Sequence, residues 1–406
     1  MSERSDRLHP DTESVSAGHS SSEHLGSLKP PIYETSTFVF ESAADGKRFF
    51  EQAYGDGEAD GYIYSRLDAP NLAPAEHRLA VWEEAEEAAI FGSGMAAIST
   101  VFLTFLRPGD LVLYSQPTYG GTTTLLTGLL TDFGVASRPF RSGVTEDDLD
   151  AMVGDDRLAM IYLETPANPT NELFDIELAS RVAGRHGARV VVDNTFLSPV
   201  WQRPLTLGAD LSLHSATKYL GGHSDLTAGA VCGGAADVAA LKQSRYEIGT
   251  TPSPSTAWLL GRSLETLRLR VERQTENATA LAAFLAAHPK ITEVRHLSLL
   301  EEGTAAYDIY KRQCDGPGAM ITFEIDGGEE ECFRFLDAMK VIRLATSLGG
   351  TESLASHMWT MSPPSTPPEV KRSLGVTPGV IRLSVGIENP GDLIADLEQA
   401  LGAIEV

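Results

Sequence analysis

The sequence predicts an α/β protein: a large domain on a mainly parallel sheet, followed by a smaller α+β domain. Two observations predict this fold. Between residues 66 and 262, short apolar runs alternate with helix-compatible stretches, the pattern of parallel strands joined by crossover helices. Beyond them, a long helical pattern over residues 256–288 leads into further apolar runs. We therefore expect an N-terminal arm at 1–65, the large domain at 66–262 and the small domain at 263–406.

The elements of the large domain follow in order along the chain. Residues 46–74 read as a loop, and apolar residues at helical spacing over 75–91 predict one helix. The acidic residues of that helix are expected on its solvated face: Glu83, Glu84, Glu86 and Glu87. The segment FGSGMAA (91–97) then places two glycines where a second helix should begin. The strands of the parallel sheet are expected in the segments 110–115, 158–165, 188–195 and 210–215, each an apolar run of four to six residues that ends in polar or turn residues.

The small domain is expected to hold a mainly antiparallel sheet. Its apolar runs lie at 318–327, 341–350 and 379–389, with helical patterns between them. An amphipathic pattern over 390–404 predicts the last helix.

Composition bounds the class of protein. The 406 residues are 42% hydrophobic and 22% charged, as in soluble globular proteins, and no apolar run reaches the ~20 residues of a membrane span. The N-terminal residues contain no apolar segment typical of a secretory signal. Three cysteines without CxxC spacing (Cys232, Cys314 and Cys332) indicate reduced thiols, so we expect a cytoplasmic protein.

The chain is strongly acidic, with a net charge of −24 from 32 basic and 56 acidic residues. This charge argues against nucleic acid or an anionic membrane as a partner. Lysine is scarce, at 8 residues against 24 arginines. Such a surface suits a high-salt cytoplasm or reflects an ordinary acidic protein from a GC-rich genome, and the sequence leaves both open.

Chemically useful residues follow the expected strands. Ligands of parallel sheets bind beyond the carboxyl ends of the strands, so these residues are the first candidates. Taken singly, Asp193 reads as a helix cap, Lys218 as a surface amine and the GSGM glycines as a turn. The residues in question are Tyr119, Glu164 and Asn168, Asp193, and Lys218 with Ser215 and Thr217.

Together these residues match the needs of pyridoxal 5′-phosphate (PLP). Its aldehyde needs a lysine, here Lys218, to form a Schiff base, and its pyridine nitrogen needs an acid such as Asp193. Tyr119 can stack on the ring, while backbone amides of GSGM and the hydroxyls of Ser215 and Thr217 can bind the phosphate. In such a pocket the lysine pKa can fall, which makes the amine a usable base.

At this point the sequence resembles the Cys/Met-metabolism family of PLP enzymes. That family includes cystathionine γ-synthase, cystathionine γ-lyase, methionine γ-lyase and the O-acylhomoserine sulfhydrylases. The resemblance implies the aminotransferase-like fold type I and covers nearly the whole chain. Its motifs, in order, are PPIYETSTF, YIYSRLDAPNL, FGSGMAAI, PTYGGT, ETPANPT, VVVDNTF, LHSATKYLGGHSD, SLGGTESLASH and IRLSVGIENPGDL.

The resemblance implies a role for each matching residue. Lys218 forms the Schiff base and shuttles protons, Asp193 pairs with the pyridine nitrogen, and Tyr119 stacks on the ring and assists proton transfer near the leaving group. The remaining roles are phosphate binding by Gly94, Met95, Ser215 and Thr217, hydrogen bonding to cofactor and substrate carboxylate by Asn168, and a carboxylate clamp by Arg382 with Ser347. We expect no metal, and we interpret His214 and His223 as loop or packing residues.

The same resemblance implies an oligomer with shared active sites. In the family, the loop that carries Tyr64 and Arg66 reaches the phosphate of the neighbouring subunit. The arm at 1–65 is therefore expected to contact a partner subunit in a homotetramer built as a dimer of dimers. This chain reads DAPNL where the family commonly has Asn-Pro.

Two positions bear on the reaction, and they disagree. Gly121 stands where typical methionine γ-lyases have a cysteine, which favours the cystathionine enzymes and several sulfhydrylases. Thr346 stands where cystathionine enzymes tend to carry a glutamate, which favours methionine γ-lyase. The predicted reaction is γ-replacement or γ-elimination on a homoserine ester or a sulfur amino acid, cystathionine γ-synthase/γ-lyase type first, and methionine γ-lyase or O-acylhomoserine sulfhydrylase type as alternatives.

Two other classes of function fit the sequence less well. A nucleotide-binding oxidoreductase needs GxGxxG, but FGSGMAAI lacks the third glycine and that function leaves Lys218 without a role. A catalytically inactive member of the family would be expected to have lost cofactor positions, and none is lost.

Overall fold

The computed structural model describes residues 8–53, 61–362 and 366–405. Its larger sheet has seven strands in the order β1-β7-β6-β5-β4-β2-β3. The strands from β6 to β3 run parallel, while β7 pairs antiparallel with both β1 and β6. The mainly parallel α/β sheet is thus confirmed. The strands are β1 (Glu87–Phe91), β2 (Asp110–Ser115), β3 (Ala136–Phe140), β4 (Arg157–Glu164), β5 (Arg189–Asp193), β6 (Leu211–His214) and β7 (Gly229–Gly233).

Helices cover both faces of this sheet. Successive strand residues point to opposite faces, so Tyr162 packs into one apolar core and its neighbour Leu163 into another. The first core includes residues of α4 (Gly94–Phe105) and α10 (Ala235–Ile248). The second includes residues of α7 (Glu146–Val153) and α8 (Ile176–His186). Burial on both faces explains why these strands are apolar throughout.

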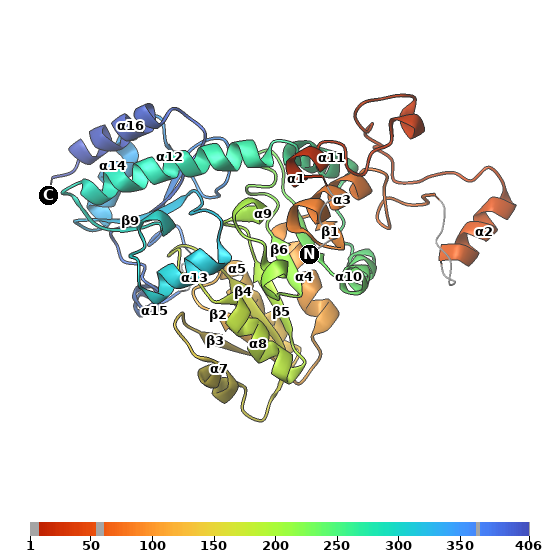
Figure 1. The fold of residues 1–406 in the computed structure, drawn as a ribbon, viewed down its shortest axis with the longest axis horizontal. Coiled ribbons are helices and arrows are strands. Elements are labelled where there is room, and N and C mark those ends of the chain that lie inside the picture. Colours follow the sequence, from red (N-terminus) through yellow and green to blue (C-terminus); the bar gives the residue numbers. More distant parts are fainter. Residues whose placement is uncertain (1–7, 54–60, 363–365, 406) are drawn as a thin grey trace.

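The smaller sheet has five strands in the order β10-β11-β12-β9-β8, antiparallel except for the β10–β11 pair. Helices α12, α14 and α16 lie together against it (Figure 1). The predicted α+β architecture is therefore present. The elements are β8 (Ile291–Arg295), β9 (Met320–Ile325), β10 (Arg343–Leu344), β11 (Leu354–His357), β12 (Val380–Ser384), α12 (Leu267–Ala287), α14 (Glu329–Ala338) and α16 (Pro390–Gly402).

Shorter helices complete the chain. They are α1 (Pro10–Glu13), η1 (Ser21–His24), α5 (Gly120–Thr127), α6 (Leu129–Asp132), α9 (Ser198–Trp201), η2 (Pro204–Leu207), η3 (Leu297–Leu299), α13 (Ala305–Gln313) and α15 (Pro368–Ser373). In the part of the chain that the structure describes, no helix combines the length and apolar composition of a membrane span.

Three expectations about the elements were wrong. The helix predicted over 75–91 is α3 (Leu72–Glu83), which ends where Glu84 adopts a left-handed φ of 54°, and strand β1 follows. The single helix predicted over 256–288 is two, α11 (Pro254–Leu264) and α12. The loop predicted from residue 46 begins inside α2 (Ala43–Ala53).

Helix α12 carries a buried polar face that touches loops of both domains. Arg270 donates from Nη1 to the Tyr219 carbonyl at 2.8 Å, and Gln274 donates to the Gly350 carbonyl at 2.6 Å. Asn277 donates to the carbonyls of Gly386 and Glu388 at 2.9 and 2.8 Å. These three side chains, one or two turns apart, hold loops from both sheets to one helix.

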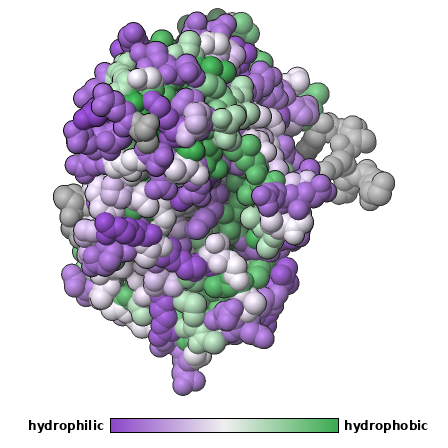
Figure 2. Space-filling view, turned by 90° about the vertical axis from the view of Figure 1, so that its left-hand side faces the viewer, coloured by the Kyte–Doolittle hydropathy of each residue, from purple (hydrophilic) through white to green (hydrophobic). Residues whose placement is uncertain are grey.

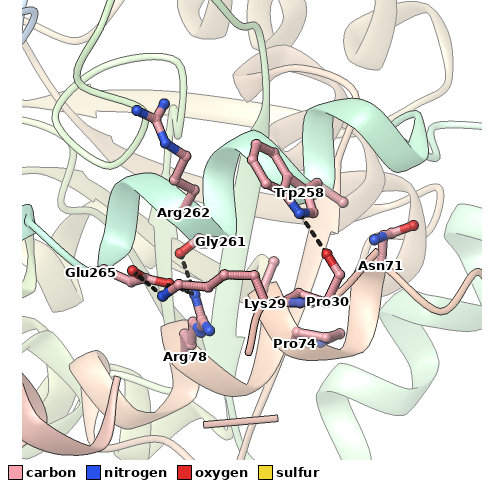
Figure 3. Close-up of a pocket in the computed structure, with 11 residues that line it drawn as sticks. Lys29, Pro30, Asn71, Pro74, Arg78, Trp258, Gly261, Arg262 and Glu265 are labelled. Atoms are coloured by element: carbon pink, nitrogen blue, oxygen red, sulfur yellow. Dashed lines mark hydrogen bonds and ion pairs between the residues drawn. The ribbon is translucent and has the colours of Figure 1, made fainter. Parts of the chain in front are cut away.

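The arm contacts the body over α3 and α11 and then leaves it. Trp258 donates from Nε1 to the Pro30 carbonyl at 2.8 Å, and Lys29 and Arg78 both bind the Glu265 carboxylate (Figure 3). Farther along, α2 stands clear of the body (Figure 1). The predicted arm, 1–65, includes residues 1–7 and 54–60, which lie outside the described residues.

Candidate active site

The carboxyl ends of β4, β5 and β6 place two acids and a lysine at one edge of the sheet. Parallel pairing sets Glu164 beside Asp193, and Asp193 beside Leu213. Lys218 follows β6 in the loop that also contains Ser215. The edge expected for a ligand is therefore the one that carries these groups.

Asp193 is a buried carboxylate held by neutral donors. Its side chain accepts hydrogen bonds from Thr195 N and Oγ1 at 3.1 and 2.5 Å, and from Tyr162 Oη at 3.3 Å. Burial raises the pKa of Asp193, while the bonds from Thr195 and the nearby His214 lower it. A carboxylate in this setting favours a cationic partner such as a protonated ring nitrogen.

Lys218 has a depressed pKa. Its Nζ donates to Ser347 Oγ at 2.7 Å, and within the described residues it makes no ion pair. Burial, and then the positive charge of Arg382, lower the pKa of Lys218 from 10.5 to about 8. The neutral amine is therefore the minor form near physiological pH, but it is far more populated than in an ordinary lysine and is able to attack a carbonyl or take a proton.

Arg382 is a buried guanidinium without a carboxylate partner among the described residues. It lies on β12, is 7% exposed, and donates from Nη1 to Asn168 Oδ1 and from Nη2 to the Ser347 carbonyl, both at 2.9 Å. Its Nε has no hydrogen-bond partner in the described structure, and burial lowers its pKa to about 10. A buried cation with no directly bonded carboxylate and one unused donor suits a substrate carboxylate.

The N-terminus of α4 provides the expected phosphate cradle. Ser93 caps the helix by accepting from Ala96 N, which leaves the first two amides, of Gly94 and Met95, without an intrahelical partner. A Cβ on Gly94 would lie 2.9 Å from the Cβ and Oγ of Ser215, so only glycine fits this approach. Free amides at a helix N-terminus beside a serine hydroxyl fit a phosphate.

Thr217 lies in the same loop, but its hydroxyl is engaged elsewhere. It donates to the Ala228 carbonyl at 3.1 Å and accepts from Ala228 N at 3.0 Å. These bonds join the lysine loop to the start of β7. The phosphate role of Thr217 stays a prediction.

Tyr119 precedes α5 and presents a ring that is about half exposed (48%). Its backbone N donates to Glu164 Oε2 at 2.7 Å. Gly121 lies under this ring, since a Cβ there would be 2.6 Å from Tyr119 Cε1 and 2.9 Å from Met95 Sδ. Thr346 is exposed and adjoins Ser347.

Tyr64 and Arg66 are placed apart from this group in the single chain. Arg66 donates to the Tyr246 carbonyl at 2.8 Å and lies 4.9 Å from the Tyr246 ring centroid, on α10. Among the described residues, neither Tyr64 nor Arg66 forms a hydrogen bond to Lys218 or the residues around it. Their cofactor role stays a prediction.

Behind the site lies a buried glutamate–histidine pair that sequence reasoning missed. Glu83, expected on a solvated face, is fully buried, and that expectation was wrong. Its Oε1 contacts His214 Nε2 at 2.5 Å and accepts from Ser212 Oγ at 2.9 Å and Asn194 Nδ2 at 3.3 Å. His214 thereby becomes a partner of a buried acid one residue before the lysine loop. The only sequence signal was a histidine at the end of an apolar strand.

The donor set fits PLP. Lys218 offers a nucleophilic amine, Asp193 an acid, and Tyr119 an exposed ring. Gly94 offers a cradle that a Cβ would fill, and the orphaned Nε of Arg382 offers a site for the substrate carboxylate. These are the parts that a PLP site requires.

Comparison with known proteins agrees with this fit. A profile described as Cys/Met metabolism PLP-dependent enzyme matches residues 11–402. The chain is 41% identical over 396 residues to L-methionine gamma-lyase of Pseudomonas putida, covering 97% of each protein. It is 39% identical over 399 residues to cystathionine gamma-synthase of Mycobacterium bovis, again covering 97% of each.

A solved structure has the same fold. Cystathionine gamma synthase from Xanthomonas oryzae pv. oryzae, in complex with aminoacrylate and cysteine, superposes with a TM-score of 0.89 at 34% identity, covering 98% of each chain. The chain therefore belongs to the Cys/Met-metabolism family of PLP-dependent enzymes, and PLP is its cofactor.

Proposed function

We propose that this enzyme catalyses γ-elimination or γ-replacement on an L-amino acid with a leaving group at Cγ, with methionine γ-lyase-type elimination as the first candidate. One observation carries the proposal. Lys218 and Arg382 both bind Ser347, the amine through its hydroxyl and the guanidinium through its carbonyl. A substrate carboxylate held by Arg382 would bring its Cα to the side of the Lys218 amine.

Each residue then has a task. When bound, PLP supplies the electron sink that stabilises negative charge on the substrate carbon. Asp193 would hold the protonated ring nitrogen, and Arg382 and Asn168 would hold the carboxylate. Lys218 would remove the proton from Cα, pass that proton on to the cofactor and so become neutral again, and then remove a proton from Cβ. Tyr119 moves a proton to the departing sulfur or oxygen.

The mouth of the site favours an uncharged leaving group. Thr346 is exposed and cannot pair with the distal ammonium of cystathionine, because it carries no charge. A thiomethyl group needs no such partner. This observation supports methionine-type substrates over cystathionine.

A second candidate, cystathionine γ-synthase/γ-lyase or O-acylhomoserine sulfhydrylase activity, is favoured by Gly121. In this structure a side chain at position 121 would meet the Tyr119 ring at 2.6 Å. The cysteine typical of methionine γ-lyases would therefore displace the ring, so Gly121 indicates a leaving-group pocket that differs from theirs.

A substrate panel separates the candidates. Methionine, cystathionine, O-acetylhomoserine and O-succinylhomoserine are each supplied with and without cysteine or sulfide, and α-ketobutyrate and thioether products are measured. α-Ketobutyrate from methionine without an added thiol supports the first candidate, while α-ketobutyrate from cystathionine but not from methionine, or product that requires a thiol, supports the second. Lys218→Ala, which cannot form the Schiff base, is the inactive control.

The charge argument at position 346 has its own test. Thr346→Glu should raise the ratio of kcat/KM for cystathionine to that for methionine, because it adds a carboxylate at the mouth. Thr346→Gln is the matched control without charge. An equal change in both variants would contradict the argument.

We also propose that the enzyme is a homo-oligomer, a dimer of dimers whose active sites take Tyr64 and Arg66 from the partner. Support comes from the arm, where Leu25, Leu28 and Val39 are at least 82% exposed. Such apolar exposure suits an interface. Mixing inactive Lys218→Ala with weakly active Arg66→Ala subunits should restore activity, since some hybrid sites hold both native residues. No recovery after verified subunit exchange would contradict shared sites.

A further inference from the structure

Glu164 links two loops of the active site with one carboxylate. It is the last residue of β4 and is 4% exposed. Its Oε2 accepts from the backbone N of Tyr119 at 2.7 Å, and its Oε1 accepts from the backbone N of Asn168 at 2.8 Å. Each oxygen therefore holds the backbone of a different loop.

These bonds continue into the substrate clamp. Asn168 accepts through Oδ1 from Arg382 Nη1, and Arg382 Nη2 donates to the carbonyl of Ser347, whose hydroxyl binds Lys218. A continuous series of hydrogen bonds of 2.7–2.9 Å thus runs from Tyr119 through Glu164 to the Lys218 amine. Glu164 is the residue that connects Tyr119, whose ring is expected to stack on the cofactor, to the carboxylate clamp of Asn168 and Arg382.

The chemistry of the side chain matches this task. A carboxylate is the only side chain of this length that accepts at both ends, because glutamine would place an NH₂ donor against one of the two amides. Glu164 makes no ion pair within the described residues, and it lies beside Asp193. Burial and the charge of Asp193 raise the pKa of Glu164, while the backbone N–H groups of Asn168 and Tyr119 lower it, so these two hydrogen bonds favour the carboxylate at a position that otherwise disfavours the charge.

We propose that Glu164 is a positioning residue, which fixes the Tyr119 ring relative to the carboxylate clamp of Arg382 and Asn168. This inference rests on the proposed function for the roles of Tyr119 and Arg382. The bond to Tyr119 is direct, whereas Arg382 keeps its second bond, to Ser347, without Glu164. Loss of the carboxylate should therefore disturb Tyr119 more than substrate binding.

The test compares Glu164→Gln with a matched control, Asp396→Asn. Asp396 is also 4% exposed and accepts backbone N–H groups, from Lys340, Val341 and Ile342, but it lies on α16 of the small domain. For Glu164→Gln we expect kcat to fall about 100-fold with KM near wild type, the effect of a misplaced reacting group. Bound PLP should stay at one per chain, and Asp396→Asn should leave both constants unchanged.

Amide hydrogen exchange of the apoproteins gives a readout that needs no activity. In wild type, the amides of Tyr119 and Asn168 should be protected although both lie outside regular structure. In Glu164→Gln, peptides spanning 116–122 and 165–171 should exchange faster while the rest of the chain does not. Unprotected amides in wild type, or exchange that rises uniformly in the variant, would overturn the proposal.

The kinetic and exchange results also separate this inference from the function on which it rests. Wild-type enzyme inactive on the whole substrate panel would refute the proposed function and leave the exchange result standing. An active wild type with an equally active Glu164→Gln would refute the positioning role alone.

Discussion

Replacing Lys218 with methionine should stabilise the apoenzyme at neutral pH, because the folded protein disfavours the protonated, charged form of the Lys218 amine. Burial and Arg382 lower the pKa of Lys218 from 10.5 to about 8 in the folded protein. The unfolded chain keeps the ordinary value, so folding weakens proton binding at this group. Methionine has a similar unbranched shape and no charge.

The size of the effect follows from the two pKa values. A lowered lysine pKa costs stability fully below the folded pKa, and that cost disappears as the pH rises from about 8 to 10.5. The difference corresponds to about 3 kcal/mol at pH 7 and about 1 kcal/mol at pH 10. Loss of the 2.7 Å bond to Ser347 Oγ offsets about 1 kcal/mol of this. We therefore expect a net gain of about 2 kcal/mol at pH 7 and about none at pH 10.

Urea unfolding of both apoproteins at pH 7 and pH 10 measures this. Comparing the difference between variant and wild type at each pH removes the effects of all other titrating groups. A variant no more stable than wild type at pH 7, or a difference that does not shrink by pH 10, would refute the reasoning.

Three further predictions follow from the site and the surface. Arg382→Lys should lower kcat/KM about 10- to 100-fold, mainly through KM, because a lysine cannot bind a carboxylate with two parallel bonds, each worth about 1.5–3 kcal/mol; unchanged KM would contradict the clamp. Gly94→Ala should weaken PLP binding about 10- to 100-fold in a spectroscopic titration of the apoenzyme, since its Cβ would meet Ser215 at 2.9 Å. An unchanged affinity for PLP would contradict the role of Gly94 in phosphate binding. With a net charge of −24, the thermal midpoint should rise between 0.1 M and 1 M KCl, as the screening length falls from about 10 Å to about 3 Å; a falling midpoint would show that repulsion between acidic groups does not limit stability.

The parallel strands could be predicted because strands that are buried on both faces consist of consecutive apolar residues, which the sequence shows as short apolar runs. Residues 110–115 are β2 without change, and the acid and lysine that follow later strands share one edge. The secondary structure of residues 75–91 was harder to predict, because the helical spacing of their apolar residues continues across the left-handed turn at Glu84 into β1. Only pairing with β7, distant in sequence, shows that the second half is a strand.

The site was predicted unevenly for a similar reason. Lys218 and Asp193 stand out because Asp193 ends one strand and Lys218 follows the next, whereas Arg382 lies within a strand and was identified through the family resemblance alone. Glu164 was noted as a loop residue. Its two backbone N–H partners lie 45 residues before it and four residues after it, and no sequence pattern shows that one carboxylate binds both. The Glu83–His214 pair was missed because a glutamate within a cluster of acidic residues usually lies on a solvated helix face.

The polar face of α12 has a consequence for how the range of substrates can be changed. Arg270 holds the carbonyl next to Lys218, while Gln274 and Asn277 hold loops of the small domain, all by buried hydrogen bonds. Moving the two domains apart would break the buried bond from Arg270 to the Tyr219 carbonyl, whereas the bonds of Gln274 and Asn277 stay inside the small domain. Efforts to broaden the accepted amino acids should therefore alter the half-exposed Tyr119 rather than loosen this junction.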